Sequence, residues 1–461
     1  MNQDTICALA TANGIGAIGI IRVSGEQAIE ICEKCFDGKA LTQQKSHTVH
    51  YGFIKDGDEV IDEVMVSIFL APKSFTTENS VEISFHGSPH IGKRILEVLI
   101  KNGARMAKAG EFTMRAFMNG RIDLSQAESI ADLIASENEA SRKVALQQLK
   151  GGISQEISVL RNDLLNFVSL IELELDFAEE DVEFADRTAL VQLLQKIESK
   201  LKSLIDSFQY GNAIKSGVAV AIIGKPNAGK STLLNALLKE ERAIVSDIAG
   251  TTRDTIEEVL HIKGNAFRLI DTAGLRETDD AIEAIGVVKA KEKVAQADVL
   301  VYLIDVATTD LKDDLAMLQE LAREDLKIII CLTKIDEVEQ AEQKAEAIAK
   351  TLQSEIPSHE LLQISAKENI HLQDLKDELS TYVEHLKSES NVVITNQRHY
   401  ESLQKSIDAV YKVKEAITHQ ISTELLAYEL RNALEHLGEI SGEFTNDEVL
   451  GNIFSKFCIG K

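Results

Sequence analysis

A glycine-rich loop between an apolar run and a helical pattern constrains this chain more than any other feature of its sequence. Residues 224–231 read GKPNAGKS and match GxxxxGK[ST], with strand-like residues 218–223 before them and helix-like residues 231–239 after them. Glycines let backbone N–H groups close around phosphate oxygens, the lysine reaches the terminal phosphates, and the serine hydroxyl faces Mg²⁺. The loop therefore predicts a nucleoside triphosphate site, and these flanks disfavour the alternative of a purely structural glycine turn.

Length and charge limit the remaining possibilities. The chain has 461 residues, enough for about three domains, and a net charge of −25 from 49 basic and 74 acidic residues. Because a surface this acidic repels polyanions, we expect any RNA contact to be local or shared with a partner. Five dispersed cysteines predict reduced thiols. With no apolar run near the roughly 18 residues of a membrane span and no signal-peptide pattern, we expect a cytoplasmic protein.

Changes in hydrophobic periodicity divide the chain into four segments. Residues 1–118 alternate β-like and helix-like runs, which predicts an α+β domain. Residues 119–215 and 380–461 repeat apolar side chains at helical spacing, whereas residues 216–379 alternate strands and helices as a doubly wound α/β sheet does. We therefore predict a multidomain fold in which an α/β P-loop domain is inserted into an all-α helical domain.

Two further motifs have the form of nucleotide-dependent switches. GTTRD at 250–254 offers a threonine hydroxyl that can complete the Mg²⁺ shell when a γ-phosphate is present. DTAG at 271–274 follows an apolar run, which puts Asp271 near the metal through water and the amide of Gly274 near the γ-phosphate. Their order after the phosphate loop is the order that a GTPase requires.

Two later motifs indicate which base is bound. TKID at 333–336 follows another apolar run, and the Asp336 carboxylate can accept both N1–H and N2–H of guanine, a pair of donors that adenine lacks. SAK at 365–367 stands where a backbone amide can touch the guanine carbonyl. The series predicts GTP rather than ATP.

Two positions depart from common GTPase patterns. The usual base-reading motif has asparagine where this chain has Thr333, so we expect selectivity to survive through Asp336 with some loss of affinity. A Ras-like enzyme has a water-orienting glutamine where this chain has Leu275, which cannot orient water. The polar candidates for that task are Arg276, Glu277 and Glu283; solvated switch-loop charges are the alternative interpretation of all three.

Three sets of motifs give the chain a family resemblance. The first set is GKPNAGKST with SDIAGTTRD and DTAGLRE, the second is the N-terminal GIIRVSG and GEFTMRAFMNGRIDL, and the third is the terminal GEFTNDEVLGNIFSKFCIGK. Through these motifs the chain resembles the bacterial tRNA modification GTPases of the MnmE (TrmE) family over essentially its whole length. That family belongs to the TrmE-Era-EngA-like GTPase superfamily. The resemblance implies a G domain that dimerises across its nucleotides and uses K⁺ where other GTPases use an arginine finger.

The resemblance also implies roles for individual residues. Asn227, Ser246, Ile248 and Thr251 match the potassium site, Ser231 and Thr252 match the Mg²⁺ ligands, and Glu283 matches the glutamate that orients the attacking water through a bridging water. Motifs and resemblance together predict nucleotide or cation contacts for Asn227, Ala228, Gly229, Lys230, Ser231, Thr232, Ser246, Asp247, Ile248, Ala249, Gly250, Thr251, Thr252, Asp271, Thr272, Ala273, Gly274, Thr333, Lys334, Asp336, Ser365, Ala366 and Lys367.

The N-terminal segment resembles a tetrahydrofolate-binding domain. Arg22, Glu82, Arg121 and the C-terminal Lys461 match its folate-contacting positions, for a 5-formyl- or methylene-tetrahydrofolate. The family more often has lysine where Arg121 stands, which changes the contact geometry. Surface ion pairing is the alternative interpretation of each of these residues. Cys458 belongs to the family's FCIGK ending and is a candidate for modification chemistry; a small buried hydrophobe is its structural alternative.

The resemblance finally implies partners and a reaction. It predicts a homodimer that acts with the flavoprotein MnmG (GidA), in a heterotetramer-type complex, to add an aminomethyl or carboxymethylaminomethyl group to carbon five of the wobble uridine in certain tRNAs. The alternative is a regulatory or ribosome-assembly GTPase without modification chemistry, similar to Era or EngA. The FCIGK ending and the folate-like domain disfavour this alternative. A membrane-linked GTPase coupled to ion transport is a third possibility, disfavoured for want of a spanning segment.

Overall fold

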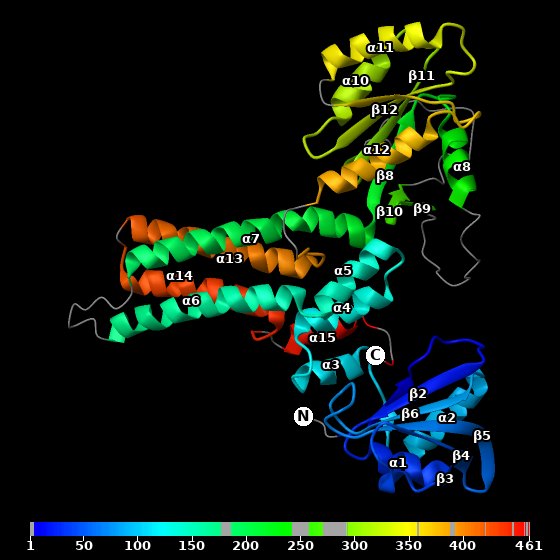
Figure 1. Cartoon of the computed structure of the whole chain (residues 1–461), viewed down its shortest axis with the longest axis vertical. Coiled ribbons are helices and arrows are strands. Elements are labelled where there is room, and N and C mark those ends of the chain that lie inside the picture. Colours follow the sequence, from blue (N-terminus) through cyan, green and yellow to red (C-terminus); the bar gives the residue numbers. More distant parts are fainter. Residues whose placement is uncertain are drawn as a thin grey trace. The chain divides into compact units, whose positions relative to one another are not determined.

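The computed structural model describes residues 4–176, 186–241, 258–270, 292, 294–356, 359–387, 392–419, 421–444, 447–455, 457 and 460. The predicted fold class is confirmed: an N-terminal α+β region, a set of long helices and an α/β region are each present (Figure 1). The contacts divide the chain into two compact units. One comprises Met1–Ile134, Ala145–Leu193 and Asp408–Lys461, and the other Ala135–Val144 and Leu194–Ile407. The four segment boundaries inferred from periodicity stay a prediction.

The N-terminal region of the first unit is built on a sheet that has seven strands within the described residues. Their order is β3-β4-β5-β6-β2-β1-β7, and all neighbours are antiparallel except the pair β1 and β7. Buried Val81, Ile83 and Phe85 alternate with more exposed residues along β6, the period expected of a strand with one buried face. The strands are β1 (Ile6–Leu9), β2 (Ile18–Ser24), β3 (Phe36–Gly38), β4 (Thr48–Asp56), β5 (Glu59–Phe69), β6 (Ser80–His86) and β7 (Arg105–Met106).

Two amphipathic helices and a short 3-10 turn cover this sheet. They are α1 (Ala28–Cys35), α2 (Pro89–Lys101) and η1 (Leu41–Gln43). Pro89 starts α2, where its missing N–H costs nothing. Ile95, Val98 and Leu99 of α2 repeat at helical spacing and are buried in the same core as the sheet residues.

Long helices complete the first unit and begin the second. They are α3 (Glu111–Met118), α4 (Leu124–Ile134), α5 (Glu139–Leu149), α6 (Gly152–Asp176), α7 (Arg187–Ser216), α13 (Gln397–Thr418), α14 (Thr423–Ser441) and α15 (Asp447–Ser455). Along α6, Ile157, Leu160 and Leu164 form a buried stripe at three- and four-residue spacing, and this helix packs on α14. Among the described residues, no helix is both long enough and apolar enough to span a bilayer.

Glycines let the end of the chain pack on the N-terminal region within the first unit. Gly110 has a φ of 65°, and a Cβ there would lie 2.6 Å from the carbonyl oxygen of Phe454. A Cβ on Gly460 would lie 2.1 Å from the carbonyl oxygen of Leu9, so no larger residue fits in this arrangement. Residues from both ends of the sequence therefore share one packed region.

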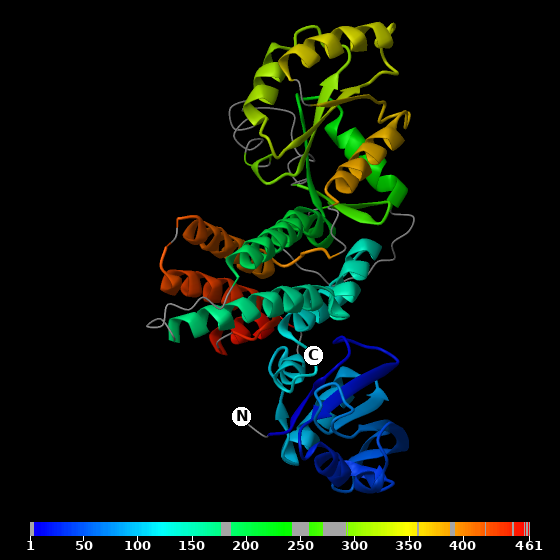
Figure 2. The same cartoon turned by 60° about the vertical axis from the view of Figure 1, so that its left-hand side comes forward.

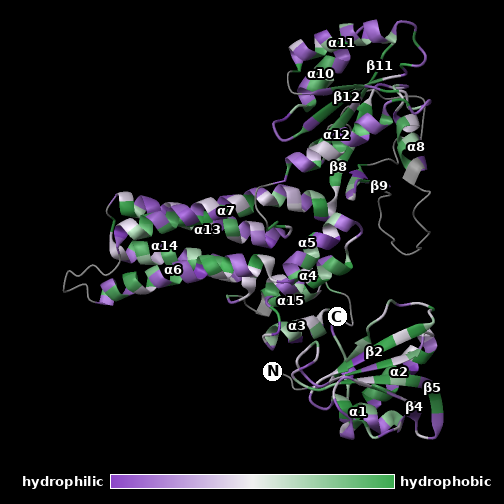
Figure 3. Ribbon diagram, in the orientation of Figure 1, coloured by the Kyte–Doolittle hydropathy of each residue, from purple (hydrophilic) through white to green (hydrophobic). Residues whose placement is uncertain are grey.

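The second unit contains a sheet with six strands among the described residues. Their order is β13-β12-β11-β8-β10-β9, and every neighbouring pair is parallel except β10 with β9. β12 reads KIIICLT, a continuous apolar run typical of parallel strands buried on both faces, and the strands of this sheet are largely green in Figure 3. The strands are β8 (Val218–Gly224), β9 (Glu258–Ile262), β10 (Asn265–Leu269), β11 (Val299–Asp305), β12 (Lys327–Thr333) and β13 (Glu360–Gln363).

Helices cover both faces of this parallel sheet (Figure 2). Leu233 of α8 (Lys230–Glu241) and Leu375 of α12 (Leu372–His385) belong to the core on one face. Leu318 of α10 (Lys312–Leu321) and Ile348 of α11 (Ala341–Glu355) belong to the core on the other. This is the doubly wound arrangement, which leaves the carboxyl ends of the strands open for a ligand.

Candidate active site

The phosphate loop lies at the point where the strand order of the parallel sheet reverses. β8 ends at Gly224 and has β11 on one side and β10 on the other, so the chain winds in both directions from β8. In open α/β sheets, ligands bind outside the carboxyl ends of the strands at such a switch point. α8 begins at Lys230, and its first N–H groups face the loop, as a phosphate site requires.

The backbone of the loop depends on glycine at two places. A Cβ on Gly224 would lie 2.6 Å from the carbonyl oxygen of Leu303 on the neighbouring strand, and Gly229 has a φ of 96°. Asn227 has a φ of 63°, the left-handed conformation that asparagine tolerates better than most residues. Ala228, Gly229 and Asn227 thus form the tight part of the loop, directly before α8.

The lysine of the motif is held inside the loop. The ammonium nitrogen of Lys230 donates to the carbonyl oxygens of Gly224 at 2.7 Å and Lys225 at 2.8 Å. These bonds draw the loop around a positive charge, and Ser231 and Thr232 follow in the first turn of α8. The donor set fits a polyphosphate with its Mg²⁺, because backbone N–H groups, an ammonium group and a serine hydroxyl lie together.

Thr333 connects the base-reading segment to the phosphate loop. Its side chain is buried, and its hydroxyl donates to the carbonyl oxygen of Ala228 at 2.9 Å. The carbonyl oxygen of Ile304 lies 3.4 Å from the same hydroxyl, which has a single proton to donate. A hydroxyl therefore tethers the two loops here, and the loss of affinity expected from the missing asparagine stays a prediction.

The remaining residues that are predicted to recognise the base lie at the same edge of the sheet. β12 and β13 are parallel neighbours, so Asp336 and Lys334 after β12 and Ser365 after β13 extend from the same ends. Ser365 and Ile370 exchange backbone hydrogen bonds, N to O at 3.1 Å and 2.9 Å, which closes the turn that contains Ala366 and Lys367. The structure thus brings together, along one edge of the sheet, the described residues that are predicted to bind the nucleotide.

Two lysines of these segments form ion pairs. Nζ of Lys334 lies 2.7 Å from a carboxylate oxygen of Asp305 at the end of β11, and Lys334 has a φ of 60°. Nζ of Lys367 lies 3.3 Å from a carboxylate oxygen of Glu337. Both pairs join neighbouring loops of the edge that carries Asp336.

Several predicted residues lie outside the described part of the chain, and their roles stay predictions. They are Ser246, Asp247, Ile248, Ala249, Gly250, Thr251, Thr252, Asp271, Thr272, Ala273, Gly274, Leu275, Arg276, Glu277, Glu283, Cys458 and Lys461.

Three of the four predicted folate-contacting residues meet in the first unit. Arg22 of β2 and Glu82 of β6 are direct cross-strand partners, with Nε of Arg22 donating to Glu82 at 2.9 Å. Arg121 donates to the carbonyl oxygen of Ser74 at 3.0 Å. The guanidinium carbons of Arg22 and Arg121 lie 5.3 Å and 5.1 Å from the ring centre of Phe75, which joins the two arginines.

Phe75 is the residue of this cluster that the sequence analysis missed. It lies in a loop, and no periodicity or motif marks it. Two guanidinium groups on one aromatic ring, with a carboxylate beside them, suit a ligand that combines an aromatic system with an acidic tail. The residues present therefore fit a folate.

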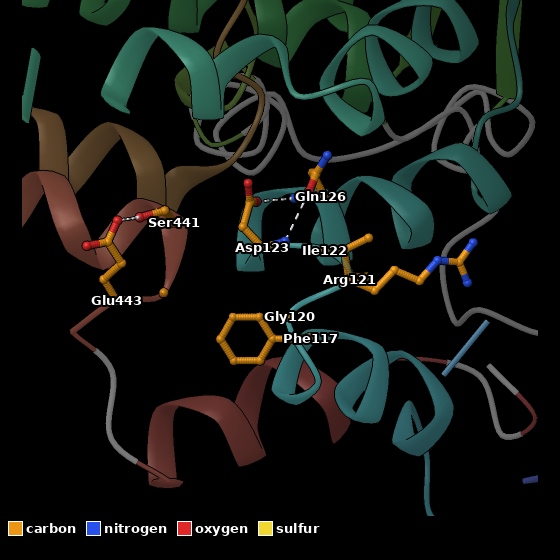
Figure 4. Close-up of a pocket in the computed structure, with 9 residues that line it drawn as sticks. Phe117, Gly120, Arg121, Ile122, Asp123, Gln126, Ser441 and Glu443 are labelled. Atoms are coloured by element: carbon orange, nitrogen blue, oxygen red, sulfur yellow. Dashed lines mark hydrogen bonds between the residues drawn. The ribbon is translucent and has the colours of Figure 1, made fainter. Parts of the chain in front are cut away.

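A pocket of about 410 Å³ borders the same region (Figure 4). Arg121 forms part of its wall, but its side chain extends away from Phe117 and Asp123. Asp123 and Gln126 exchange side-chain and backbone bonds of 3.0 Å and 2.9 Å that start α4. The lining residues are Phe117, Gly120, Arg121, Ile122, Asp123, Gln126, Ser441, Gly442 and Glu443.

The fold and the site together define a class of protein. A parallel sheet whose first strand leads into GKPNAGKS and whose next-to-last described strand leads into TKID is characteristic of the P-loop GTPases. Two family matches refine this class: residues 5–121 match the family described as GTP-binding protein TrmE N-terminus, and residues 124–458 match the MnmE helical domain.

Curated relatives are similar over the whole length. The tRNA modification GTPase MnmE of Flavobacterium psychrophilum is 53% identical, with 100% of this chain and 99% of the relative covered. The proteins of the same name from Flavobacterium johnsoniae and Cytophaga hutchinsonii are each 51% identical over 100% of this chain, covering 100% and 98% of the relatives. The chain belongs to the MnmE family of tRNA modification GTPases, and its enzyme class is GTP hydrolase.

A solved structure resembles part of the chain. The crystal structure of Era in complex with MgGDPNP and nucleotides 1506-1542 of 16S ribosomal RNA covers 42% of this chain and 66% of that chain, with 27% identity and a TM-score of 0.29.

Proposed function

We propose that this chain is a potassium-activated GTPase whose G domains dimerise, and that with MnmG it installs the aminomethyl or carboxymethylaminomethyl group at carbon five of the wobble uridine of certain tRNAs. One observation carries the proposal: a GKPNAGKS loop with left-handed Asn227 stands at the switch point of the sheet, in a chain at least half identical to MnmE relatives over its full length. Family membership also favours it over a regulatory or ribosome-assembly GTPase.

The phosphate loop would hold GTP through its backbone and its lysine. In this proposal Lys230 exchanges its bonds to the carbonyls of Gly224 and Lys225 for the β- and γ-phosphate oxygens. Ser231 and Thr252 would hold Mg²⁺, while Asn227, with Ser246, Ile248 and Thr251, would hold K⁺. These cations, when bound, neutralise negative charge on the phosphates.

Guanine recognition would fall to the edge formed by the ends of β12 and β13. Asp336 would accept two guanine N–H groups, and the turn that contains Ala366 would offer an amide to the carbonyl. Glu283 would orient the attacking water. The Glu283→Ala variant should bind GTP normally and lose turnover; normal turnover would refute this role.

The N-terminal cluster, defined as Arg22, Glu82, Arg121 and Phe75, would bind a tetrahydrofolate. Arg22, Arg121 and Lys461 supply positive charge, Glu82 accepts N–H groups, and Phe75 offers an aromatic face. Cys458 is proposed as a chemically active thiol of the modification reaction, in a homodimer that works with MnmG on tRNA in the cytoplasm.

The tRNA proposal is tested by mass spectrometry of wobble uridines from cells that lack this chain. We expect the modification at carbon five to disappear and to return on expression of the full chain, but not of the Lys230→Ala variant. Intact modification in the deletion strain would favour the regulatory alternative.

The potassium proposal needs a separate experiment. GTP turnover is measured in potassium and sodium salts at equal ionic strength, with the wild-type chain and with Asn227→Ala. We expect a potassium-dependent rate that Asn227→Ala loses. Equal rates in both salts would contradict the proposal without affecting the GTPase assignment.

A further inference from the structure

A lysine side chain in the phosphate loop points away from the loop and onto a helix. Nζ of Lys225, the second residue of GKPNAGKS, lies 2.9 Å from a carboxylate oxygen of Asp314 and 3.4 Å from one of Asp313. Both aspartates belong to the first turn of α10, which follows β11 in sequence. The loop that connects β8 to α8 is thereby joined to another element of the same unit.

The two aspartates differ in their surroundings. The side chain of Asp314 is 2% exposed, whereas that of Asp313 is 88% exposed. The other carboxylate oxygen of Asp314 accepts a hydrogen bond of 3.1 Å from the hydroxyl of Tyr302, which is buried on β11. A buried carboxylate needs a compensating charge, so Lys225 neutralises Asp314 and is held by it.

The pKa shifts of Lys225 and Tyr302, the two partners of Asp314, agree with this geometry. The interaction with Asp314 raises the pKa of Lys225 above its ordinary value. Burial, together with the negative charge of Asp314, raises the pKa of Tyr302. The phenol stays protonated and the ammonium group charged at any physiological pH.

We infer that Lys225 is a positioning residue for nucleotide binding, which acts through the Lys225 network, defined as Lys225, Asp314 and Tyr302. The main chain of Lys225 is part of the site itself. Its carbonyl oxygen accepts from the ammonium group of Lys230 at 2.8 Å and from the backbone N–H of Ala228 at 3.2 Å. Fixing the Lys225 side chain against α10 therefore fixes the turn that presents Asn227 and Ala228 to the ligand.

The inference predicts weaker nucleotide binding rather than slower chemistry. The network does not reach the reacting phosphate, so its loss should weaken GDP and GTP alike and raise KM with little change in kcat. A variant that merely folded less well would instead lower the active fraction and leave KM unchanged. A change in KM without a change in kcat thus distinguishes a positioning role in nucleotide binding from a general loss of folded protein.

The experiment uses the full chain, mant-GDP fluorescence for Kd, and steady-state GTP turnover for KM and kcat. Lys225→Met should raise both Kd and KM by about tenfold, and Lys225→Arg, which keeps the charge, by less than about threefold. Asp313→Asn is the matched control for Asp314→Asn: it removes a carboxylate charge from the neighbouring, exposed position and should change neither value.

A double variant distinguishes positioning from direct contact with the nucleotide. Lys225→Met and Asp314→Asn, each also measured alone, remove the same contact, so the double variant should bind mant-GDP no more weakly than Lys225→Met alone. If the double variant instead loses affinity by the product of the two single effects, the effect of Lys225 does not pass through Asp314 and the inference is wrong. Unchanged Kd and KM in Lys225→Met would also overturn it.

This inference rests on nucleotide binding alone, not on potassium or tRNA modification. Wild-type protein that bound mant-GDP and turned over GTP equally in both salts would refute the potassium proposal and leave the Lys225 network untouched. Wild-type protein that bound no mant-GDP would instead refute the GTP site itself.

Discussion

The two sheets of this protein carry their candidate sites in different ways. In the six-stranded sheet, every neighbouring pair except β10 and β9 is parallel, and polar residues come shortly after buried strands, as Lys225 follows β8 and Asp336 follows β12. In the seven-stranded sheet, Arg22 and Glu82 lie within strands and meet only through antiparallel register. The site in the six-stranded sheet is built from contiguous sequence motifs. The Arg22–Glu82 site forms only when strand pairing brings distant residues together.

This difference has an energetic counterpart. The phosphate loop packs against its surroundings, with a buried hydroxyl at Thr333 and a glycine that touches β11. The N-terminal cluster is half-buried, with side-chain exposures of 22% for Arg22 and 27% for Glu82. Single substitutions should therefore cost more at the first site than at the second.

The largest effect is expected at Gly224. The Gly224→Ala variant places a Cβ 2.6 Å from the carbonyl oxygen of Leu303, backbone that cannot move without displacing β11. We expect nucleotide affinity to fall by about tenfold, which lies within an overpacking cost of about 1–3 kcal/mol. Kd for mant-GDP measures this, and Gly451→Ala on α15, where a Cβ meets nothing within 4 Å, is the control. Normal binding by Gly224→Ala would show that the loop is not rigid.

The next effect concerns Thr333. Thr333→Val keeps the shape but leaves the carbonyl of Ala228 without its hydroxyl donor, which costs about 1–3 kcal/mol when the group stays buried. We expect Kd for mant-GDP to rise by about fivefold or more, with Thr333→Ser close to wild type. Thr333→Asn tests the expectation from the sequence: tighter binding than wild type would support the predicted loss of affinity, and equal binding would contradict it.

Sequence reasoning succeeds where a motif and its strand are contiguous. GKPNAGKS, TKID and SAK each follow an apolar run, so their clustering at one edge follows from parallel pairing. The tether from Thr333 to Ala228 was not predicted, because 105 residues separate the two.

The N-terminal cluster shows what a pattern cannot supply. Arg22 and Glu82 are 60 residues apart, and register decides whether they pair or face opposite sides of the sheet. Phe75 sits in a loop with no signal at all, although two guanidinium groups lie over its ring. Only the family resemblance pointed to this site, and only the structure added Phe75.

A third prediction tests whether the N-terminal cluster is a ligand site. Arg22→Met removes the guanidinium that pairs with Glu82 and lies over Phe75, so affinity for 5-formyl-tetrahydrofolate should fall by about fourfold. Isothermal titration calorimetry measures this, with mant-GDP binding as the control for folding. Unchanged folate affinity would leave the cluster a surface ion pair.

Arg121→Lys should have a smaller effect. Lysine keeps the charge and is the residue the family more often has, but it loses the planar contact with Phe75. We expect folate affinity to change by less than about threefold. A loss as large as that of Arg22→Met would mean that Arg121 grips the ligand in a fork geometry that lysine cannot reproduce.

The smallest effect is expected at an exposed pair of the seven-stranded sheet. Nδ1 of His86 lies 2.7 Å from a carboxylate oxygen of Asp62, whose other oxygen accepts the His86 backbone N–H at 2.8 Å. The hydrogen bond to Asp62 raises the pKa of His86 above its ordinary value of 6.5. Because the folded-state pKa is the higher one, the pair stabilises the fold fully below about pH 6.5, and this contribution is lost as pH rises through the raised pKa.

The Asp62→Asn variant tests how strongly the carboxylate of Asp62 acts on His86. Removing the carboxylate should bring the pKa of His86 back towards 6.5, which a titration of ¹³C-labelled histidine by NMR measures directly. A His86 pKa that is already at 6.5 in the wild type would mean that water screens the pair completely, as it does for many exposed ion pairs. A shift in the expected direction would show that a carboxylate only 9% exposed retains its influence on a histidine that is 68% exposed.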